Sequence, residues 1–226
     1  RGGAGVSVDS RTMSEASSKD LLRRHGVPFA EERVVTSVEA AVDAARAVGF
    51  PTVVKLNGDR IAHKTERGLV RLGLVSEDAV AAAATELLAA ATPEDGEVSL
   101  LVAPMLRGSR ELIAGLLTDP QFGPVVMLGI GGIFAEALGD VAFRLVPFDL
   151  DEARSLLDDL SLQSILGPFR GEPAVDRDAV ARVLVALAEV AADEPDVVSA
   201  DLNPLIIVDG RPIAVDALVE LGGGRP

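Results

Sequence analysis

Cysteine, tryptophan and tyrosine are absent from this 226-residue sequence, and seven phenylalanines are its only aromatic residues. Without cysteine no disulfide framework can form, which suits a reducing compartment, so we expect a cytoplasmic protein. With so few aromatic rings the chain lacks the stacking platforms that bind single-stranded nucleic acid. Its longest apolar runs, such as residues 125–130, stop well short of the roughly 18 residues that a membrane span needs. We therefore expect no membrane partner.

Basic residues are also fewer than acidic ones. The sequence has 21 Lys+Arg against 35 Asp+Glu, which gives a formal net charge of -14. Such a chain repels phosphate backbones, so we expect no nucleic-acid partner. The hydrophobic fraction of 48% is high enough for a folded core rather than disorder. Residues 1–12 are rich in Gly and Ser without a long apolar run, so we expect an extension or linker and not a signal peptide.

Capping residues and apolar periodicity predict helices, and short apolar runs bounded by Gly or Pro predict strands between them. The two types alternate without a simple order, so the fold class is α/β (α+β). A break near residues 104–108 separates two lobes. We expect helices at 17–26, 36–49, 76–91, 149–160 and 176–192, and strands at 52–56, 69–75, 98–102, 112–116, 125–130, 205–208 and 213–215.

Two basic side chains close together in the sequence are candidates for phosphate chemistry. Lys55 ends the predicted strand 52–56, where a buried ammonium group needs an anionic partner. It either binds phosphate oxygens or lies at an exposed strand end. His63 lies in a polar loop and is either a nucleophile toward phosphorus or an incidental surface residue. The other histidine, His25, is at a predicted helix end and is interpreted as structural.

An acidic cluster is predicted near the carboxyl end. Asp201 and Asn203 are two residues apart, so they share one face of a strand. The sequence Asp209-Gly210 is a strong hairpin signal that returns the chain so that Asp216 comes back beside them. Two carboxylates and an amide oxygen suit Mg²⁺, although turn-forming residues around a proline are the alternative. A glycine-rich stretch over 119–132 either approaches an anion through its backbone or forms tight turns.

The order of these motifs resembles the ATP-grasp domain of the NDP-forming acyl-CoA synthetases. Members of this family include the ADP-forming acetyl-CoA synthetase β subunit and, more distantly, the succinyl-CoA synthetase β subunit. The resemblance covers residues 21–221, nearly the whole chain. It rests on the segments 22–28, 49–55, 61–65, 110–115, 119–124, 131–136, 201–205 and 215–217.

The resemblance implies an ATP-grasp fold whose two lobes hold the nucleotide between them. The N-terminal helix and small lobe would cover 13–104, and the large lobe with the metal site would cover 105–226. Its implied cofactors are Mg²⁺ and ATP/ADP. In the family, His63 would accept a phosphoryl group and pass it to ADP, and Asn203 and Asp216 would hold Mg²⁺. The implied nucleotide-binding positions are Lys55, Val102, Pro104, Glu111, Glu136 and Asp201.

The implied reaction is acyl-CoA + ADP + phosphate ⇌ carboxylate + ATP + CoA. An α subunit or fused CoA-binding domains would carry the CoA chemistry, so a hetero-oligomer is expected. Two alternatives stay open. One is a regulatory ATP-binding module beside a CoA-binding or acetyltransferase domain, which is slightly favoured by Leu69 in place of a family glycine. The other is an ATP-grasp carboxylate–amine ligase, which has no need of a phosphorylated histidine.

Overall fold

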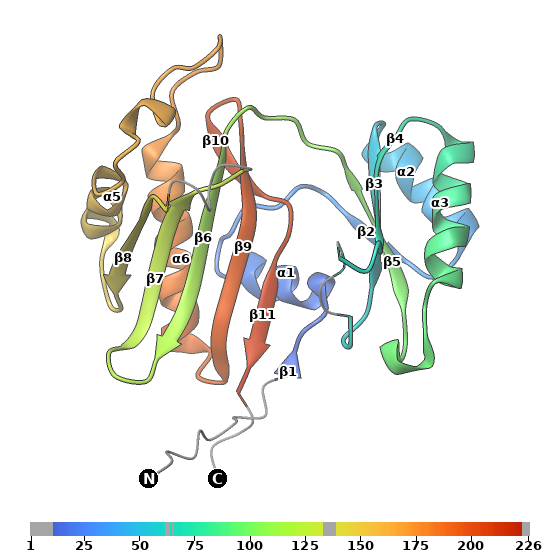
Figure 1. The fold of residues 1–226 in the computed structure, drawn as a ribbon, viewed down its shortest axis with the longest axis horizontal. Coiled ribbons are helices and arrows are strands. Elements are labelled where there is room, and N and C mark those ends of the chain that lie inside the picture. The colour runs from blue at the N-terminus through green and yellow to red at the C-terminus, as the bar shows by residue number, and fades with distance from the viewer. Residues whose placement is uncertain (1–10, 62–63, 65, 133–138, 223–226) are drawn as a thin grey trace.

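Two separate β-sheets, each with helices on one face, make up the protein (Figure 1). The computed structural model describes residues 11–61, 64, 66–132 and 139–222. The strands of the larger sheet are β1 (Arg11–Thr12), β6 (Glu111–Asp119), β7 (Gly123–Ile130), β8 (Val141–Leu145), β9 (Val197–Val208), β10 (Arg211–Ala214) and β11 (Leu218–Leu221). Those of the smaller sheet are β2 (Arg33–Val35), β3 (Thr52–Asn57), β4 (Val70–Leu74) and β5 (Ser99–Pro104). The larger sheet has the order β1-β11-β9-β6-β7-β8 with β10 beside β9, and the smaller has β2-β5-β3-β4.

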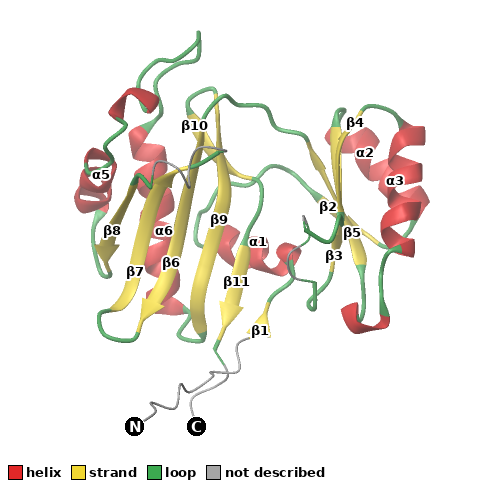
Figure 2. Ribbon diagram, viewed as in Figure 1, coloured by secondary structure: helices red, strands yellow, loops and turns green. Residues whose placement is uncertain are grey.

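The helices cover the outer faces of the two sheets (Figure 2). The helices are α1 (Glu15–Arg24), α2 (Val38–Val48), α3 (Glu77–Ala89), α5 (Leu150–Asp158) and α6 (Arg177–Asp193), with short 3-10 turns η1 (Pro93–Asp95) and η2 (Gln163–Ile165). Helices α2 and α3 pack on the smaller sheet, whereas α5 and α6 pack on the larger one. The uncovered face of the smaller sheet is turned toward the larger sheet, and α1 packs against β11 and α6 at the side of the larger sheet that is nearer to the smaller one.

Each sheet has its own hydrophobic core, as expected for two lobes. The chain crosses from the smaller to the larger sheet between Pro104 and Glu111. Helix α1 was grouped with the small lobe in the sequence-based division, but its apolar residues Leu21 and Leu22 lie in the core of the larger sheet. Arg11–Thr12, assigned above to a linker, forms strand β1 and pairs with β11. The larger lobe therefore includes both ends of the described chain.

Helix starts follow side-chain caps, and most of the predicted caps are confirmed. Ser76, Asp149 and Asp176 each accept a hydrogen bond from the first turn of the helix that follows. Two caps were predicted wrongly. Helix α1 begins after Ser14 rather than at 17, and Ser37, not its neighbour Thr36, caps α2. Adjacent Ser and Thr residues offer equivalent hydroxyls, so the sequence alone does not decide which one accepts the bond.

Several strands were not predicted. Strands β1, β2, β8 and β11 are short or lie at sheet edges, and the first half of the central strand β9 was missed as well. Strand β8 alternates exposed Val141, Phe143 and Leu145 with residues facing the core, so its pattern does not resemble a buried apolar run. Pairing with longer neighbours, rather than local composition, makes these segments extended.

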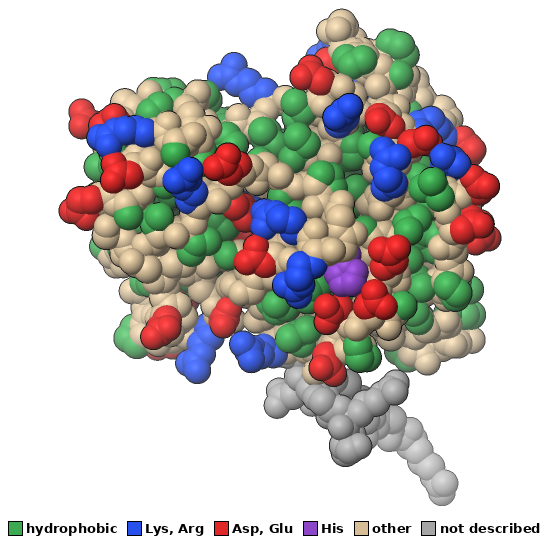
Figure 3. Space-filling view, turned by 180° about the vertical axis from the view of Figure 1, so that it is seen from behind, with side chains coloured by type: hydrophobic (Ala, Val, Ile, Leu, Met, Phe, Trp, Pro, Cys, Tyr) green, Lys and Arg blue, Asp and Glu red, His purple; other side chains and the backbone are tan. Residues whose placement is uncertain are grey.

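The surface mixes charges of both signs. On the face shown in Figure 3, acidic and basic side chains are interspersed, with no large area of one sign. One such exposed contact joins α2 to α3, where Arg46 Nε lies 2.6 Å from Glu77 Oε1. Exposed pairs of this kind contribute little to stability. None of the helices in the described ranges is both long and apolar enough to cross a membrane.

Candidate functional site

A cavity of about 350 Å³ lies between the two sheets. Val53, Lys55 and Pro104 line it from the smaller sheet. Glu111, Pro204 and Ile206 line it from the larger sheet, and Lys19 of α1 also lines it. Its walls are mostly apolar with a few charged groups, the usual character of a small-molecule site.

Strand alternation explains why Lys55 reaches this cavity. Val54 and Leu56 are fully buried in the core of the smaller sheet. Their neighbours Val53 and Lys55 therefore point from the opposite face of β3, toward the larger sheet. The Lys55 side chain is only 10% exposed. The alternative of an exposed strand end is therefore wrong, whereas phosphate binding by Lys55 stays a prediction.

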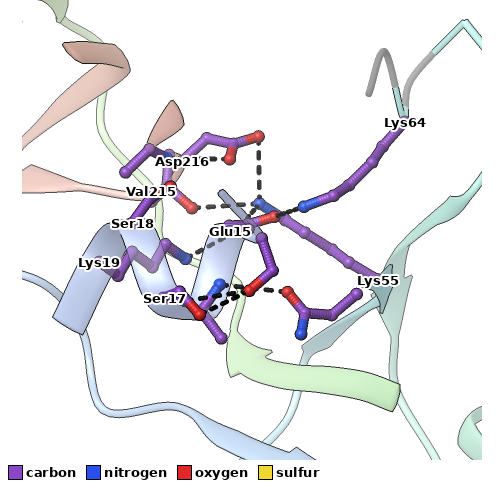
Figure 4. A network of polar contacts seen from close by, with 12 residues as sticks. Glu15, Ser17, Ser18, Lys19, Lys55, Lys64, Val215 and Asp216 are labelled. Atoms are coloured by element: carbon purple, nitrogen blue, oxygen red, sulfur yellow. Dashed lines mark hydrogen bonds and ion pairs between the residues drawn. The ribbon is translucent and has the colours of Figure 1, made fainter. Parts of the chain in front are cut away.

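Glu15, the first residue of α1, is the central partner of Lys55 (Figure 4). Its Oε1 lies 2.7 Å from Lys55 Nζ and 2.7 Å from Lys19 Nζ. Its Oε2 lies 2.6 Å from Lys64 Nζ. Lys55 also donates to the Val215 carbonyl at 3.1 Å. One buried carboxylate therefore holds three ammonium groups, and two of these lysines, Lys19 and Lys55, line the cavity.

The charges in this cluster shift each other's pKa. Burial on its own raises the pKa of Glu15, but the positive charges of Lys55, Lys19 and Lys64 outweigh it and hold that pKa well below its usual range. Burial likewise lowers the pKa of Lys55, while Glu15 and Asp216 more than compensate, so the pKa of Lys55 lies above its ordinary value. Both groups are charged at neutral pH, and the cluster is a fixed set of ion pairs.

The predicted acidic cluster forms on β9 and after β10. Leu202 is fully buried in the larger core, whereas Asp201 and Asn203 on either side are exposed on the opposite face. The hairpin brings the chain back, because the residue before Asp216 donates its N–H to the Pro204 carbonyl at 3.2 Å. Asp216 Oδ2 then lies 3.4 Å from Lys55 Nζ. The hairpin interpretation of this segment is confirmed.

A β-bulge shapes this part of β9. Leu112 of β6 pairs with Leu205, whereas Ala114 pairs with Leu202, so β9 has one extra residue within 203–204. A bulge bends the strand and changes which residues face each side. It places consecutive residues on the cavity side, where a regular strand would turn one of them toward the core. Proline in a central strand is a signal for such a bulge.

Both carboxylates of this cluster are harder to ionise than usual. The walls of the cleft desolvate Asp201 and so raise its pKa, and the charge of Asp216 raises it further. Burial raises the pKa of Asp216, the charge of Glu15 adds to this, and the nearby lysines offset only part of it. Carboxylates in this state are stabilised by a cation. Two carboxylates and an amide oxygen are hard donors that fit Mg²⁺, so Asp201, Asn203 and Asp216 are suitable to hold it.

We expect Asp201→Asn to stabilise the ligand-free protein. Because the folded-state pKa of Asp201 is raised, its ionisation costs stability as pH rises above the ordinary aspartate value, and the full cost is present at pH 7. Because Asp201 is exposed and solvent screens its charge, the gain should stay within about 0.5 kcal/mol, or about 1–2 °C in the melting midpoint, and it should shrink as pH falls toward 4. Thermal melts of the wild type and variant across this pH range test it.

Asp119→Asn is the matched control. Asp119 Oδ1 accepts from the backbone N–H groups of Gln121 and Phe122 in the β6–β7 turn, and asparagine keeps that acceptor. Its melting midpoint should follow the wild type. A lower midpoint for Asp201→Asn at pH 7 would contradict the sign of the shift.

The β6–β7 turn also bears on the glycine-rich stretch 119–132, which was predicted either to approach an anion or to form tight turns. Residues 119–124 form a tight hairpin connection.

The other candidate residues have different positions. Pro104 and Glu111 line the cavity. Val102 does not face it, because its side chain is fully buried in the smaller core and its strand neighbours are Arg33 and Val54. Of the candidates, His63 and Glu136 lie outside the described residues. Glu15 and Lys19 were missed, although a Glu and a Lys four residues apart on a helix can signal an ion pair.

Glycines permit close approach beside Glu111. The N–H of Gly131 donates to the Glu111 carbonyl at 2.8 Å, and a Cβ on Gly131 would lie 3.0 Å from the Glu111 carbonyl carbon. Gly132 has a φ of +85°, which favours glycine. Leu69, where the family has a second glycine, is 2% exposed in the smaller core, and its N–H donates to the Lys64 carbonyl at 2.8 Å. That leucine therefore has a packing role.

Comparison with known proteins agrees with this architecture. The family model described as "ATP-grasp domain" matches residues 6–221. The acetate–CoA ligase [ADP-forming] I subunit beta of Pyrococcus furiosus is 33% identical over 213 residues, 93% of this chain and 92% of the relative. The acetate–CoA ligase [ADP-forming] I of Archaeoglobus fulgidus is 34% identical over 92% of this chain, which spans only 30% of that longer protein.

Solved structures give the same result. The acetyl-coenzyme A synthetase 1 of Ca. Korarchaeum cryptofilum, in complex with coenzyme A and Ca-AMPCP, matches with a TM-score of 0.85 and 33% identity over 93% of both chains. Another structure of that synthetase holds Mg-AMPPCP, with its phosphohistidine segment pointing towards the nucleotide binding site. The resemblance inferred from sequence motifs is confirmed. The chain belongs to the ATP-grasp family, together with the β subunits of ADP-forming acetate–CoA ligases.

Proposed function

We propose that this chain is the nucleotide-binding part of an ADP-forming acyl-CoA synthetase and moves a phosphoryl group between His63 and ADP or ATP. The observation that carries the proposal is the buried Lys55 in the inter-lobe cavity, 3.4 Å from Asp216. A cation beside carboxylates suited to Mg²⁺ is the arrangement that phosphoryl transfer needs, because the transferred group spreads negative charge over its oxygens. Relatives at 33–34% identity are named as ADP-forming acetate–CoA ligases.

Phosphoryl transfer between ATP and His63 needs no further reactant. In the direction from ATP, the lone pair of one His63 imidazole nitrogen forms an N–P bond with the γ-phosphorus, and the bond from that phosphorus to the β–γ bridging oxygen breaks. The electron pair leaves on ADP, and the second imidazole nitrogen can release its proton. Lys55 would bind phosphate oxygens and orient them. Mg²⁺, when held by Asn203 and Asp216 beside Asp201, supplies charge neutralisation.

Adenine recognition is proposed for the apolar end of the cavity. Pro104 has no N–H, and the N–H of Met105 already donates to the Pro51 carbonyl at 2.9 Å. The base would therefore depend mainly on apolar packing against residues such as Val53 and Ile206. Coenzyme A chemistry is proposed for a partner, an α subunit or fused domains, which makes the working enzyme a hetero-oligomer or a longer chain. A cytoplasmic location remains a prediction.

Labelling with [γ-³²P]ATP and Mg²⁺ tests the transfer. We expect acid-labile, base-stable label on the wild-type chain and none on His63→Ala, because phosphohistidine requires the imidazole. Phe143→Ala is the control, since this side chain is exposed on the outer strand β8. It should label as the wild type does. Tight nucleotide binding by a wild-type chain that takes up no label would contradict the proposal.

The same experiment separates the two alternatives. Nucleotide binding without label would favour a regulatory ATP-binding module. Formation of a hydroxamate by the isolated chain, from a carboxylate, ATP and hydroxylamine, would instead favour a carboxylate–amine ligase, because that chemistry makes an acyl-phosphate directly. Among the described residues, no group of three or more His, Cys, Asp or Glu side chains is arranged to hold a metal ion, so Mg²⁺ binding here is expected to depend on the nucleotide phosphates as further ligands.

A further inference from the structure

Lysine is confined to one place in this protein. Of the 21 basic residues in the sequence, 18 are arginines and only three are lysines. All three lysines lie within 2.7 Å of the Glu15 carboxylate. The other ion pairs among the described residues use arginine, apart from those of Lys55 with Asp216, Lys19 with Glu32 and His25 with Glu194. A compact ammonium group with three donors is used only where several cations must share one carboxylate.

Glu15 is placed at the junction of the two lobes. Helix α1 is tied to the smaller sheet, because the N–H of Ala16 donates to Asn57 Oδ1 at 3.1 Å. It is tied to the larger sheet as well, because Ser18 Oγ accepts from the N–H of Val219 at 3.1 Å. The Glu15 side chain is 1% exposed. A buried carboxylate held from both sides is a rigid reference point for the side chains that bind it.

The two oxygens of Glu15 divide the lysines between them. Oε1 contacts Lys55 on β3, and Oε2 contacts Lys64 in the loop that follows. Lys64 is the residue directly after His63 in the sequence. Lys19, the third lysine, is held between Glu15 and Glu32 at 2.7 Å from each. Without the Glu15 charge, three ammonium groups would face one another in a space that is nearly closed to water, which is strongly unfavourable.

We infer that Glu15 is a positioning residue for phosphoryl transfer, which sets the places of the Lys55 and Lys64 ammonium groups relative to each other. Through Lys55 it orients the cation that meets the nucleotide phosphates. Through Lys64 it binds the side chain of the residue that follows His63, the proposed phosphoryl carrier, in the sequence. The inference rests on the proposed function. It assigns to α1, which lies outside the two sheets, a part in aligning donor and acceptor.

Chemical footprinting of the lysines tests the geometry without any turnover. Brief treatment with an acetylating reagent, followed by peptide mass spectrometry, reports three side chains and little else. In Glu15→Gln, the acetylation rates of Lys55 and Lys64 should rise about fivefold or more, because loss of the carboxylate charge removes the ion pairs that hold both ammonium groups in place. Glu32→Gln is the matched variant, and only Lys19 should respond. Unchanged protection of Lys55 and Lys64 in Glu15→Gln would overturn the proposal.

Transfer rates test the functional part. At saturating Mg·ATP, labelling of His63 should slow by about tenfold or more in Glu15→Gln. Glu86→Gln is the control, because Glu86 pairs with Arg71 at the surface. This variant should be labelled at the wild-type rate. Lys64→Met should cause a similar loss. The double variant Glu15→Gln/Lys64→Met should be no slower than the worse single variant, because both changes remove one interaction. Additive losses, or a lower melting midpoint with normal labelling, would overturn the inference.

The two proposals fail in different ways. An unlabelled wild-type chain contradicts the proposed phosphoryl transfer, and the lysine footprint then still decides whether Glu15 sets the lysine positions. Normal labelling of Glu15→Gln beside a labelled wild type contradicts only the role of Glu15. The variant keeps the shape of the side chain and one acceptor oxygen, so its folded state can be verified by thermal melting before either measurement.

Discussion

Replacing Lys55 by methionine should weaken Mg·ATP binding by about 100-fold or more. Loss of a buried charged partner from an anion costs about 2–5 kcal/mol, and every 1.4 kcal/mol or so is tenfold in affinity. Lys55 is only 10% exposed and faces the inter-lobe cavity, so solvent cannot take over its role. Isothermal titration with Mg·ATP, or with a nonhydrolysable analogue, measures the change directly. The fold should survive, because Glu15 keeps two other lysine partners.

Arg71→Met is the matched control for this experiment. Arg71 lies on the neighbouring strand β4, one register position from Lys55, and pairs with the exposed Glu86 at 3.1 Å. The Arg71→Met substitution removes one positive charge from the same sheet without changing the cavity, so the affinity for Mg·ATP should change little. A second variant, Lys55→Arg, asks whether charge alone is enough. The larger planar guanidinium should bind nucleotide poorly, because three acceptors already surround the ammonium group. If Lys55→Met bound Mg·ATP with wild-type affinity, Lys55 would not be part of the nucleotide site.

Local signals in the sequence predicted the helices and the interior strands well. Helices such as α6 combine an N-cap with an apolar face, and strands such as β3 lie between a proline and a polar loop. These signals arise within a few residues, so they can be interpreted without tertiary contacts. Edge strands are different. Strand β2 has three residues and none of them is buried, so only its pairing with β5 identifies it.

The residues of the candidate site also differ in whether local signals reveal them. Lys55 and Asp216 could each be selected from the sequence, because a strand end and a hairpin signal are local features. That the two side chains meet could not be predicted from such signals. Glu15 could not be selected, since a first-turn glutamate usually complements the helix dipole at the surface. Its burial depends on where α1 packs between the lobes. Val102 was taken from the hinge by resemblance, but the alternation of β5 turns it into the core.

Arg110 shows the same limit, and its replacement by methionine should cost roughly 3 kcal/mol of stability. The residue begins one of the segments on which the family resemblance rests, but its side chain is 1% exposed and hydrogen-bonded to residues 55–63 positions further along the chain. Its guanidinium donates to the carbonyls of Gly167 at 2.9 Å and Pro173 at 2.6 Å, and to Glu172 at 3.3 Å. Methionine fills the space of the stem but leaves these acceptors without a donor.

The melting midpoint of Arg110→Met should fall by about 6–12 °C, given roughly 2–4 °C per kcal/mol for a chain of this size. Arg154→Met is the control, because Arg154 pairs with Asp151 and Asp178 at the surface and is 40% exposed. It should cost well under 1 kcal/mol or so. Protease cleavage within 163–175 should also increase in Arg110→Met alone, since the guanidinium anchors that loop. A midpoint within about 2 °C of the wild type would mean that the carbonyls find other donors, and that the loop holds its shape without Arg110.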